Sequence, residues 1–273
     1  MICDNLQVLI TTMNLSSGDK LLHDMNIRSD FLIGNQCQVN KNEEMLFGTH
    51  KGEIISRNAR GVGKNRNELL SRATADICVL ADDDMTFTDL YETTVLNVFS
   101  EHKTADVVIF NLDSEDDFYA RKASGKSARV STFNYMSYGA ARIAFRLQPI
   151  LYHGITFNTM FGGGTPHKCG EDSLFLRDCM RAGLKIITVP ISIAHLRNAH
   201  ESTWFDGYND KYFFDKGVFL AFAHPRLCRF FAIYLVLKHP EYLSVTRNRK
   251  NILKTIMRGI KFVKTKEYKG GKH

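Results

Sequence analysis

Residues 77–84 read I-C-V-L-A-D-D-D, an apolar run that ends directly in three consecutive acids, Asp82, Asp83 and Asp84. The run has the length and composition of one buried strand. Ligands of α/β proteins bind at the carboxyl ends of parallel strands, which is where these acids stand. The stretch therefore predicts both a central strand and a site beside it.

The chain on either side of this strand alternates short apolar runs with helical patterns. That alternation predicts an α/β domain with a mostly parallel sheet. Asp89 and Glu92 stand in capping-box spacing at the start of one helix, and Gly183 marks the end of another. The expected strands are 6–10, 31–34, 77–81, 107–112 and 185–189, and the expected helices are 65–74, 89–100 and 171–182.

The three acids favour a metal site. Adjacent carboxylates repel one another unless a cation neutralises them, and their hard oxygen atoms suit Mg²⁺ or Mn²⁺. Capping of the next helix is the commoner role for a single Asp after a strand. Here Asp89 is already the expected cap, and three acids exceed what one cap needs.

Two glycine-containing segments carry further candidate residues. In R-G-V-G-K-N-R-N (60–67), Lys64 and Arg66 are able to contact phosphates. The segment lacks the P-loop pattern, and taken alone it is explained better as a solvated basic helix start. In F-G-G-G-T-P-H-K-C-G-E-D (161–172), a glycine loop expected to be mobile leads to Glu171 and Asp172. Acids are common in a first helical turn, and the functional alternative is a carboxylate held at a cleft as a general base.

Composition limits the architecture. The chain has 273 residues, 44% hydrophobic residues and 5 prolines, which suits one large globular domain or one domain with an appendage. Its six scattered cysteines form no C-x-x-C pair, which favours free thiols in a reducing cytosol. No apolar run approaches the 20 or so residues of a membrane span, and we expect no secretory signal in the first residues.

The net charge of +7 is unevenly distributed. Residues 226–273 contain 13 Lys/Arg and 2 Asp/Glu, whereas the rest of the chain contains 23 and 27. Such a basic tail indicates an anionic partner, a membrane surface or a nucleic acid. Its expected helices are 215–223, 226–238 and 248–264. The last has an apolar stripe with a basic rim, which suits either a membrane interface or packing on the catalytic domain.

Taken in chain order, these motifs resemble those of family 2 glycosyltransferases with the GT-A fold. L-I-T-T-M-N (9–14) is similar to the first-strand motif that enters the nucleotide site, and Arg66-Asn67 to the "R-N" helix start. Asp82–Asp84 stands as the D-x-D motif, and G-E-D (170–172) as the "E-D" motif. The resemblance covers about residues 1–205, and 202–217 also resembles bacterial capsule, exopolysaccharide and lipopolysaccharide assembly members.

The resemblance implies a Rossmann-like, nucleotide-binding mixed sheet flanked by helices in 1–215, and a basic helical extension in 216–273. It implies an inverting transfer of sugar from a nucleotide-diphosphate donor to a saccharide or lipid-linked saccharide acceptor, assisted by Mn²⁺ or Mg²⁺. The setting would be bacterial surface polysaccharide synthesis in the cytoplasm, at the inner face of the membrane, with 226–273 as the peripheral contact.

The same resemblance implies roles for individual residues. Asp172 would be the general base with Glu171 in support, and Asp84 would hold the metal with His195 as a further contact. His200 is a second histidine that stands near this position in the sequence. Residues 161–164 (Phe161, Gly162, Gly163 and Gly164) would form an acceptor loop. The nucleotide-sugar pocket would use Thr11, Thr12, Asn14, Asn35, Gln36, Lys64, Arg66, Asp82 and Asp83.

One departure and two alternatives remain. Where many members carry an acidic motif after the second strand, this chain reads I-G-N-Q-C-Q, so Asn35 or Gln36 must serve instead or the pocket differs. A sugar-nucleotide-forming nucleotidyltransferase also uses acids on an α/β sheet, but its basic glycine-rich loop after the first strand is missing. A nucleic-acid-binding protein would use the basic tail, yet the body is net acidic and carries no recognised binding motif, so no nucleic acid is expected.

Overall fold

The computed structural model describes residues 5–114, 124–197, 207–244 and 248–265. The chain forms two compact units. Residues 1–166 with 171–202 make up the first, here called the sheet unit, and residues 167–170 with 203–273 make up the second, here called the helical unit. Helix α7 (Asp210–Ala223) runs through residue 215, the boundary suggested by the sequence.

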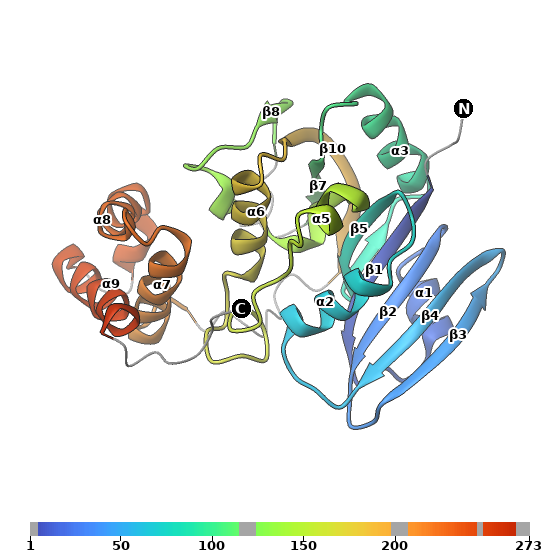
Figure 1. Ribbon diagram of the computed structural model, residues 1–273, viewed down its shortest axis with the longest axis horizontal. Helices are drawn as coiled ribbons and strands as arrows, with labels where there is room; N and C mark the ends of the chain where they lie inside the picture. The colour runs from blue at the N-terminus through green and yellow to red at the C-terminus, as the bar shows by residue number, and fades with distance from the viewer. Residues whose placement is uncertain (1–4, 115–123, 198–206, 245–247, 266–273) are drawn as a thin grey trace. The chain divides into compact units, whose positions relative to one another are not determined.

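The sheet unit contains one mixed sheet, in the order β3-β4-β2-β1-β5-β9-β7-β10-β6, with β8 paired to β10 (Figure 1). Its parallel core consists of β4, β2, β1 and β5, and β10 runs parallel to β7. The strands are β1 (Leu6–Met13), β2 (Asp30–Gln36), β3 (Lys41–Phe47), β4 (His50–Arg57), β5 (Ile77–Asp82), β6 (Met85–Phe87), β7 (Val107–Asp113), β8 (Ala128–Arg129), β9 (Ile143–Arg146) and β10 (Ile186–Leu196).

The five expected strands are present, but the sheet is mixed rather than mostly parallel. Antiparallel β9 lies between β5 and β7, and the hairpin β3–β4 forms one edge. The sequence pattern missed the hairpin because β3 reads K-N-E-E-M-L-F and is exposed over most of its length. An edge strand with charged side chains lacks the apolar alternation that identifies a buried strand.

Helices cover both faces of the sheet (Figure 1). On one face, α1 (Gly18–Asp24) and α3 (Tyr91–Glu101) pack on a cluster that includes Val8 and Val79. On the other, α2 (Val62–Arg72), α5 (Leu147–Tyr152) and α6 (Glu171–Arg181) pack on a cluster that includes Leu9 and Leu80. The alternation within β1 and β5 thus places apolar side chains on both faces, as buried central strands require. Short 3₁₀ turns, η1 (Tyr135–Ser137) and η2 (Ala140–Arg142), precede β9.

The two predicted helix signals had different outcomes. Gly183 ends α6 as expected, with φ 84° and a hydrogen bond from Leu184 N to Cys179 O. The capping role of Asp89 is wrong, because α3 begins at Tyr91 and its N-cap is Leu90. Asp89 instead accepts hydrogen bonds from the side chains of Asn26 and Arg28.

The helical unit contains α7, α8 (Cys228–Lys238), a 3₁₀ turn η3 (Pro240–Ser244) and α9 (Arg249–Lys264). Helices α7 and α9 approach so closely that a Cβ atom on Gly217 would overlap the carbonyl oxygen of Ile256. A Cβ atom on Gly259 would likewise overlap the carbonyl oxygen of Phe214. The α9 stripe, with Ile252 and Ile260, is therefore buried within this unit. The sequence suggested a membrane interface or the catalytic domain as its partner, and the structure gives α7.

Two further observations concern the described part of the chain. No helix there combines the length and apolar character needed to cross a membrane. No disulfide joins the cysteines described there, which are Cys37, Cys78, Cys169, Cys179 and Cys228; Cys3 lies outside the described residues.

Replacement of Gly217 tests the α7–α9 contact. Alanine ordinarily stabilises a helix relative to glycine by about 1 kcal/mol. Here the added Cβ meets backbone, so Gly217→Ala is expected to lower the free energy of unfolding by at least about 2 kcal/mol. Gly125→Ala, whose Cβ would enter open space, serves as the control in chemical denaturation. A stabilised Gly217→Ala variant would contradict the close packing.

Candidate active site

The carboxyl ends of β1, β2 and β5 meet at one edge of the sheet. Thr11 lies beside Asp82 on β5, and Thr12 beside Asn35 on β2. The Thr11 hydroxyl donates to Asp82 Oδ1 at 2.8 Å and the Thr12 hydroxyl to Asp83 Oδ2 at 2.5 Å. The first-strand motif and the three acids therefore form one polar cluster.

Arg66 joins this cluster to the acids of α6. Its guanidinium, 4% exposed, donates to Asp82 Oδ1 at 2.9 Å and to Asp172 Oδ1 at 3.0 Å. The distance to Glu171 Oε1 is 3.3 Å. Burial alone would lower the pKa of Arg66. The neighbouring carboxylates of Asp82, Asp172 and Glu171 outweigh this effect and raise the pKa above its ordinary value. One charge thus binds carboxylates supplied by β5 and by α6.

The neighbours of Arg66 hold α2 in place. Asn65 Nδ2 donates to the Gly34 carbonyl on β2 at 2.7 Å. Asn67 exchanges two hydrogen bonds with the backbone of Phe157, at 2.8 and 2.7 Å. The anchoring roles of both asparagines were not identified from the sequence, because their partners are distant along the chain. The interpretation of this segment as a solvated helix start holds for Lys64, which is exposed, but not for Arg66, which is buried.

Glu171 and Asp172 share a first helical turn but differ in environment. Glu171 is buried, and its burial together with the adjacent Asp172 raises its pKa well above the usual range, while Arg66 opposes the rise. The Asp172 side chain is 24% exposed, and its Oδ2 accepts from Ala140 N at 3.0 Å. The geometry leaves Asp172 as the more accessible carboxylate of the pair.

The two glycine-containing segments pack against each other. Val62 N donates to Gly163 O at 3.0 Å, and a Cβ atom on Gly164 would come within 3.0 Å of Gly61 N. A Cβ atom on Gly162, where φ is 98°, would overlap the carboxyl group of Glu171. Phe161 is fully buried. The sequence offered no link between these segments, which lie about 100 residues apart.

Asp84 is an acid with little compensation. Its partial burial, together with Asp82 and Asp83, raises its pKa to about 6. Arg197 opposes this shift and is also hydrogen-bonded to the turn, from its guanidinium to Asp83 O at 2.6 Å and from its backbone N to Asp84 O at 2.8 Å. The sequence reasoning missed Arg197, although a cation two residues beyond His195 was the available signal.

The proposed histidine ligands are less well defined. His195 lies on β10 opposite Thr86 and is exposed, while His200 lies outside the described residues. Within the described ranges, no group of three or more His, Cys, Asp or Glu side chains is arranged to hold a metal ion.

The polar residues at the carboxyl ends of β1 and β2 mainly bind the protein's own backbone. Asn14 is exposed with φ 50°, and its N–H donates to Gln36 O at 3.0 Å. Asn35 accepts from Leu15 N at 3.0 Å, and Gln36 Oε1 accepts from Gly61 N at 2.8 Å. Of the two amides that stand in place of the acidic motif, Gln36 therefore positions the glycine segment before α2, and Asn35 joins the segment after β1 to Ser56 on β4.

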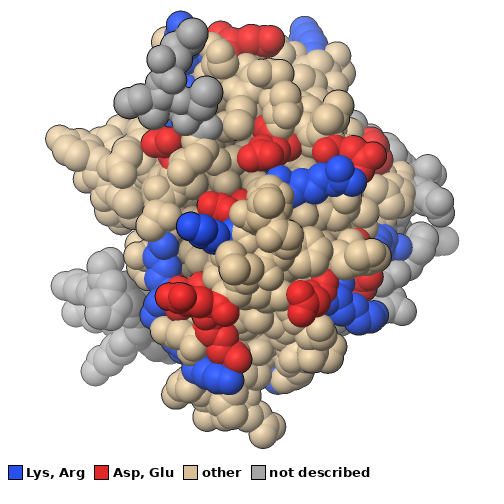
Figure 2. Space-filling view, turned by 90° about the vertical axis from the view of Figure 1, so that its right-hand side faces the viewer, with Lys and Arg blue, Asp and Glu red and all other residues tan. Residues whose placement is uncertain are grey.

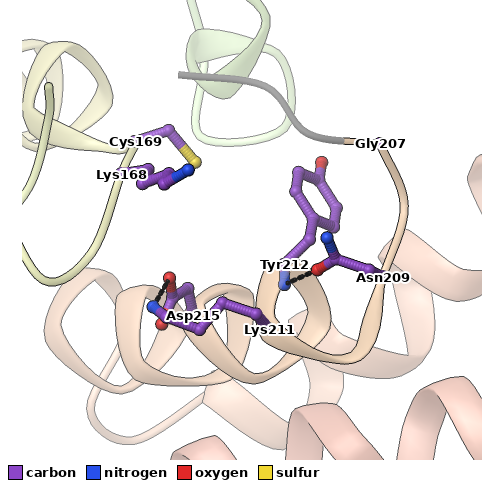
Figure 3. Close-up of a pocket in the computed structure, with 7 residues that line it drawn as sticks. All are labelled: Lys168, Cys169, Gly207, Asn209, Lys211, Tyr212 and Asp215. Carbon is purple, nitrogen blue, oxygen red and sulfur yellow. Dashed lines mark hydrogen bonds and ion pairs between the residues drawn. The ribbon is translucent and has the colours of Figure 1, made fainter. Parts of the chain in front are cut away.

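A cavity of about 130 Å³ lies in the helical unit (Figure 3). Asp215 at its wall is almost fully buried and is paired with His167 Nδ1 at 2.8 Å and with Lys211. This volume is below the roughly 300 Å³ of most ligand pockets. The convergent acids and the raised pKa of Asp84 make the sheet edge the better candidate active site. The cavity is lined by Lys168, Cys169, Gly207, Asn209, Lys211, Tyr212 and Asp215.

The sequence family described as "Glycosyl transferase family 2" matches residues 41–178, just over half of the chain. The chain belongs to glycosyl transferase family 2. It is therefore a glycosyltransferase, and its mixed sheet with flanking helices is the GT-A fold expected from the motifs. No curated protein matches the chain.

Solved structures share the fold of this glycosyltransferase at low sequence identity. S. aureus TarS 1–349 in complex with UDP-GlcNAc is 12% identical with TM-score 0.64, over 94% of this chain and 81% of that one. The mannosyltransferase PcManGT from Pyrobaculum calidifontis, in complex with GDP-Man and Mn²⁺, is 12% identical with TM-score 0.53, over 98% and 76%. In another TarS structure, 13% identical with TM-score 0.57, the match spans 80% of this chain and 39% of TarS.

Arg66→Met tests the ion cluster. Loss of the cation leaves Asp82, Glu171 and Asp172 facing one another, so the free energy of unfolding should fall by about 3–5 kcal/mol at pH 8. The loss should be smaller at pH 5, because Glu171, whose pKa burial raises, is then more often protonated. Arg66→Lys should restore less than half, because an ammonium lacks the planar fork. Arg28→Met, at an exposed ion pair with Asp89, should change stability by less than about 1 kcal/mol.

Asp84→Asn tests whether the ionised carboxylate of Asp84 destabilises the fold. The measurement uses metal-free protein with a chelator. A pKa raised from 3.8 to about 6 means that ionised Asp84 destabilises the fold as pH rises from about 4 through 6. The shift corresponds to at most about 3 kcal/mol, which solvent screening lowers to about 1–2 kcal/mol. The variant should therefore gain that stability at pH 7.5 and none near pH 3.5. Asp89→Asn, whose parent carboxylate is 75% exposed, should show no such gain.

Proposed function

We propose that this glycosyltransferase moves a sugar from a nucleotide-diphosphate donor to an acceptor hydroxyl by a single inverting displacement. The observation that carries the proposal is the connection, through Arg66, of the acidic turn at Asp82–Asp84 with Asp172. TarS with UDP-GlcNAc and PcManGT with GDP-Man support a nucleotide-sugar donor in this fold.

The acidic turn at Asp82–Asp84 supplies oxygen ligands for a divalent cation. Mg²⁺ is commonly held by one or two carboxylates together with substrate phosphates, and Mn²⁺ also prefers such hard oxygen ligands. Asp84 fits this role because its pKa is raised by burial and by repulsion from Asp82 and Asp83, and a bound cation compensates both effects. We assign the cation to Asp84, with His195 as a further contact. When bound, the ion would stabilise negative charge on the leaving diphosphate.

Other residues around the turn orient the donor. We assign Asp82 and Asp83 to the ribose or diphosphate, at the positions fixed by the Thr11 and Thr12 hydroxyls. Lys64 is exposed at the first turn of α2, where its ammonium is able to reach a phosphate. In the same proposal Asn14, Asn35 and Gln36 border the nucleotide pocket.

Asp172 is the proposed general base. Arg66 and Ala140 N fix its two oxygens, and each oxygen keeps a lone pair for an acceptor hydroxyl. Glu171, buried and with a raised pKa, shares Arg66 and supports this geometry. The hydroxyl proton passes to Asp172 as the hydroxyl oxygen attacks the sugar. Two adjacent carboxylates in different environments suit such a division of roles.

The acceptor would lie near the glycine loop 161–164, which contacts Glu171. We propose a saccharide or lipid-linked saccharide acceptor in bacterial surface polysaccharide synthesis, at the inner face of the cytoplasmic membrane. The sequence of 202–217, which resembles polysaccharide-assembly enzymes, and the basic residues of 226–273 support this setting.

Thermal-shift measurements with UDP, GDP, CDP and their sugars, with and without Mn²⁺, test donor binding. A ligand at 100 times its Kd stabilises the native state by about 2.7 kcal/mol, which raises the Tm. We expect one nucleotide series to stabilise the protein only with Mn²⁺. Asp84→Ala should abolish the shift, measured against its own ligand-free Tm, while Asp89→Ala keeps it. An unchanged shift in Asp84→Ala would refute the metal assignment.

Asp172→Asn separates binding from chemistry. The amide keeps the shape of the side chain but cannot accept the hydroxyl proton, so turnover should fall at least about 100-fold. The donor-induced Tm shift should remain close to that of the wild type. Full turnover in Asp172→Asn would remove this residue as the base.

A further inference from the structure

Helix α8 is apolar on both sides. Its inner side, with Cys228, Phe231, Ala232, Leu235 and Val236, is buried in the helical unit. Four large apolar side chains are exposed by about half or more, and are here called the α8 outer face: Leu227 (57%), Phe230 (55%), Ile233 (46%) and Leu237 (61%).

The α8 outer face is continuous along the helix. Successive members are three or four residues apart, a spacing that places side chains on one side of an α-helix. A helix that is apolar all round is normally covered, and contiguous apolar patches on a protein surface mark interaction sites. This face therefore requires a partner rather than solvent.

Basic residues border the α8 outer face. By helical spacing, Arg229 and Lys238 fall at its opposite edges, and Arg226 directly precedes Leu227. The Lys238 ammonium lies 5.3 Å from the centre of the Tyr234 ring. No acid occurs from Arg226 through Lys238. The partner therefore combines an apolar region with negative charge.

Helix α9 adds positive charge to the same unit. Because its apolar stripe packs against α7, its exposed side includes Lys254, Arg258 and Lys261, spaced four and three residues apart. The face in Figure 2, by contrast, shows acidic and basic side chains interspersed. The excess of positive charge belongs to 226–273, with 13 Lys/Arg against 2 Asp/Glu.

The charge distinguishes an anionic lipid surface from a second copy of this chain. A symmetric dimer would place the same basic rim on both sides of one interface, and such like-charge contacts are unfavourable. Anionic headgroups attract basic residues, while the acyl boundary accepts apolar side chains.

We propose that the α8 outer face is a membrane-binding surface. Its apolar side chains enter the boundary between headgroups and acyl chains, and Arg226, Arg229 and Lys238 bind lipid phosphates. Only the purpose of this surface, which is to hold the enzyme where a lipid-linked acceptor lies, rests on the proposed function. The membrane contact is thereby assigned to the α8 outer face and not to the apolar stripe of α9.

Vesicle co-sedimentation of the full chain tests this surface. The probes are vesicles of phosphatidylcholine alone and vesicles containing about one third phosphatidylglycerol. Wild-type protein should bind the anionic vesicles and lose binding at high salt. The double variant Phe230→Ser, Ile233→Ser should bind at least about tenfold more weakly, because it removes half of the apolar contact. Replacement of Arg226 and Arg229 by Gln should weaken binding to anionic vesicles only.

A matched control uses exposed apolar residues of the sheet unit. Leu151 and Tyr152 are 44% and 87% exposed, so Leu151→Ser, Tyr152→Ser removes comparable surface and should leave vesicle binding unchanged. Unchanged Tm values and donor-induced shifts would show that each variant is folded and that donor binding is separate.

Two results would overturn the membrane assignment while leaving the donor site unaffected. One is the absence of wild-type binding to anionic vesicles. The other is a concentration-dependent dimer, seen by sedimentation velocity, that the Phe230→Ser, Ile233→Ser variant disrupts. Equal loss of donor binding in the α8 and control variants would instead indicate unfolding, which the Tm values identify.

Discussion

A buried guanidinium holds the candidate active site of the sheet unit together. Arg66 binds carboxylates from β5 and α6, and α2 carries it there because Asn65 and Asn67 bind the backbone of β2 and of the segment before the glycine loop. Removal of one partner from a buried ion pair strongly destabilises the fold, because the other charge is left uncompensated. These elements therefore depend on one another. The shared cation fixes the relative positions of these elements, and rotation of α2 or α6 would separate the acids from Arg66.

The same cluster leaves negative charge in excess. Arg66 and Arg197 face five carboxylates at this edge of the sheet. The pKa of Asp84 is raised first by burial and then by the neighbouring charges of Asp82 and Asp83. Local conflict of this kind is expected at a functional site, where stability is given up for chemistry. In the proposed function, a donor with a bound divalent cation would supply the missing positive charge at the turn, which would account for the adjacent acids there.

The predictability of these features depends on how far apart their partners lie in sequence. The strand at 77–82 and the end of α6 at Gly183 were readable, because apolar runs and helix stops are local signals. The mutual arrangement of Arg66 and Asp172 was not, since the two stand 106 positions apart. The edge strand β3 was missed because its side chains are polar, and Asp89 was misassigned because its partners, Asn26 and Arg28, lie about 60 residues away.

The amphipathic helices show a different limit. A stripe on α9 was visible in the sequence, but its partner was not, because the contact depends on the small size of Gly217 and Gly259 rather than on any apolar pattern. Only with α9 covered does the outer face of α8 stand out as the apolar surface that still needs a partner. Sequence periodicity identifies such stripes, and the structure decides which of them are already used.

The most direct test is to follow the phosphorus atoms of the donor by ³¹P NMR, with the protein, diamagnetic Mg²⁺ and either UDP-GlcNAc or GDP-Man. We expect one donor to be converted to free nucleoside diphosphate, by transfer or by slow hydrolysis, at a rate that falls in Arg66→Lys. Release of pyrophosphate when the same protein is given a nucleoside triphosphate and a sugar phosphate, without nucleoside diphosphate formation from either donor, would contradict this expectation.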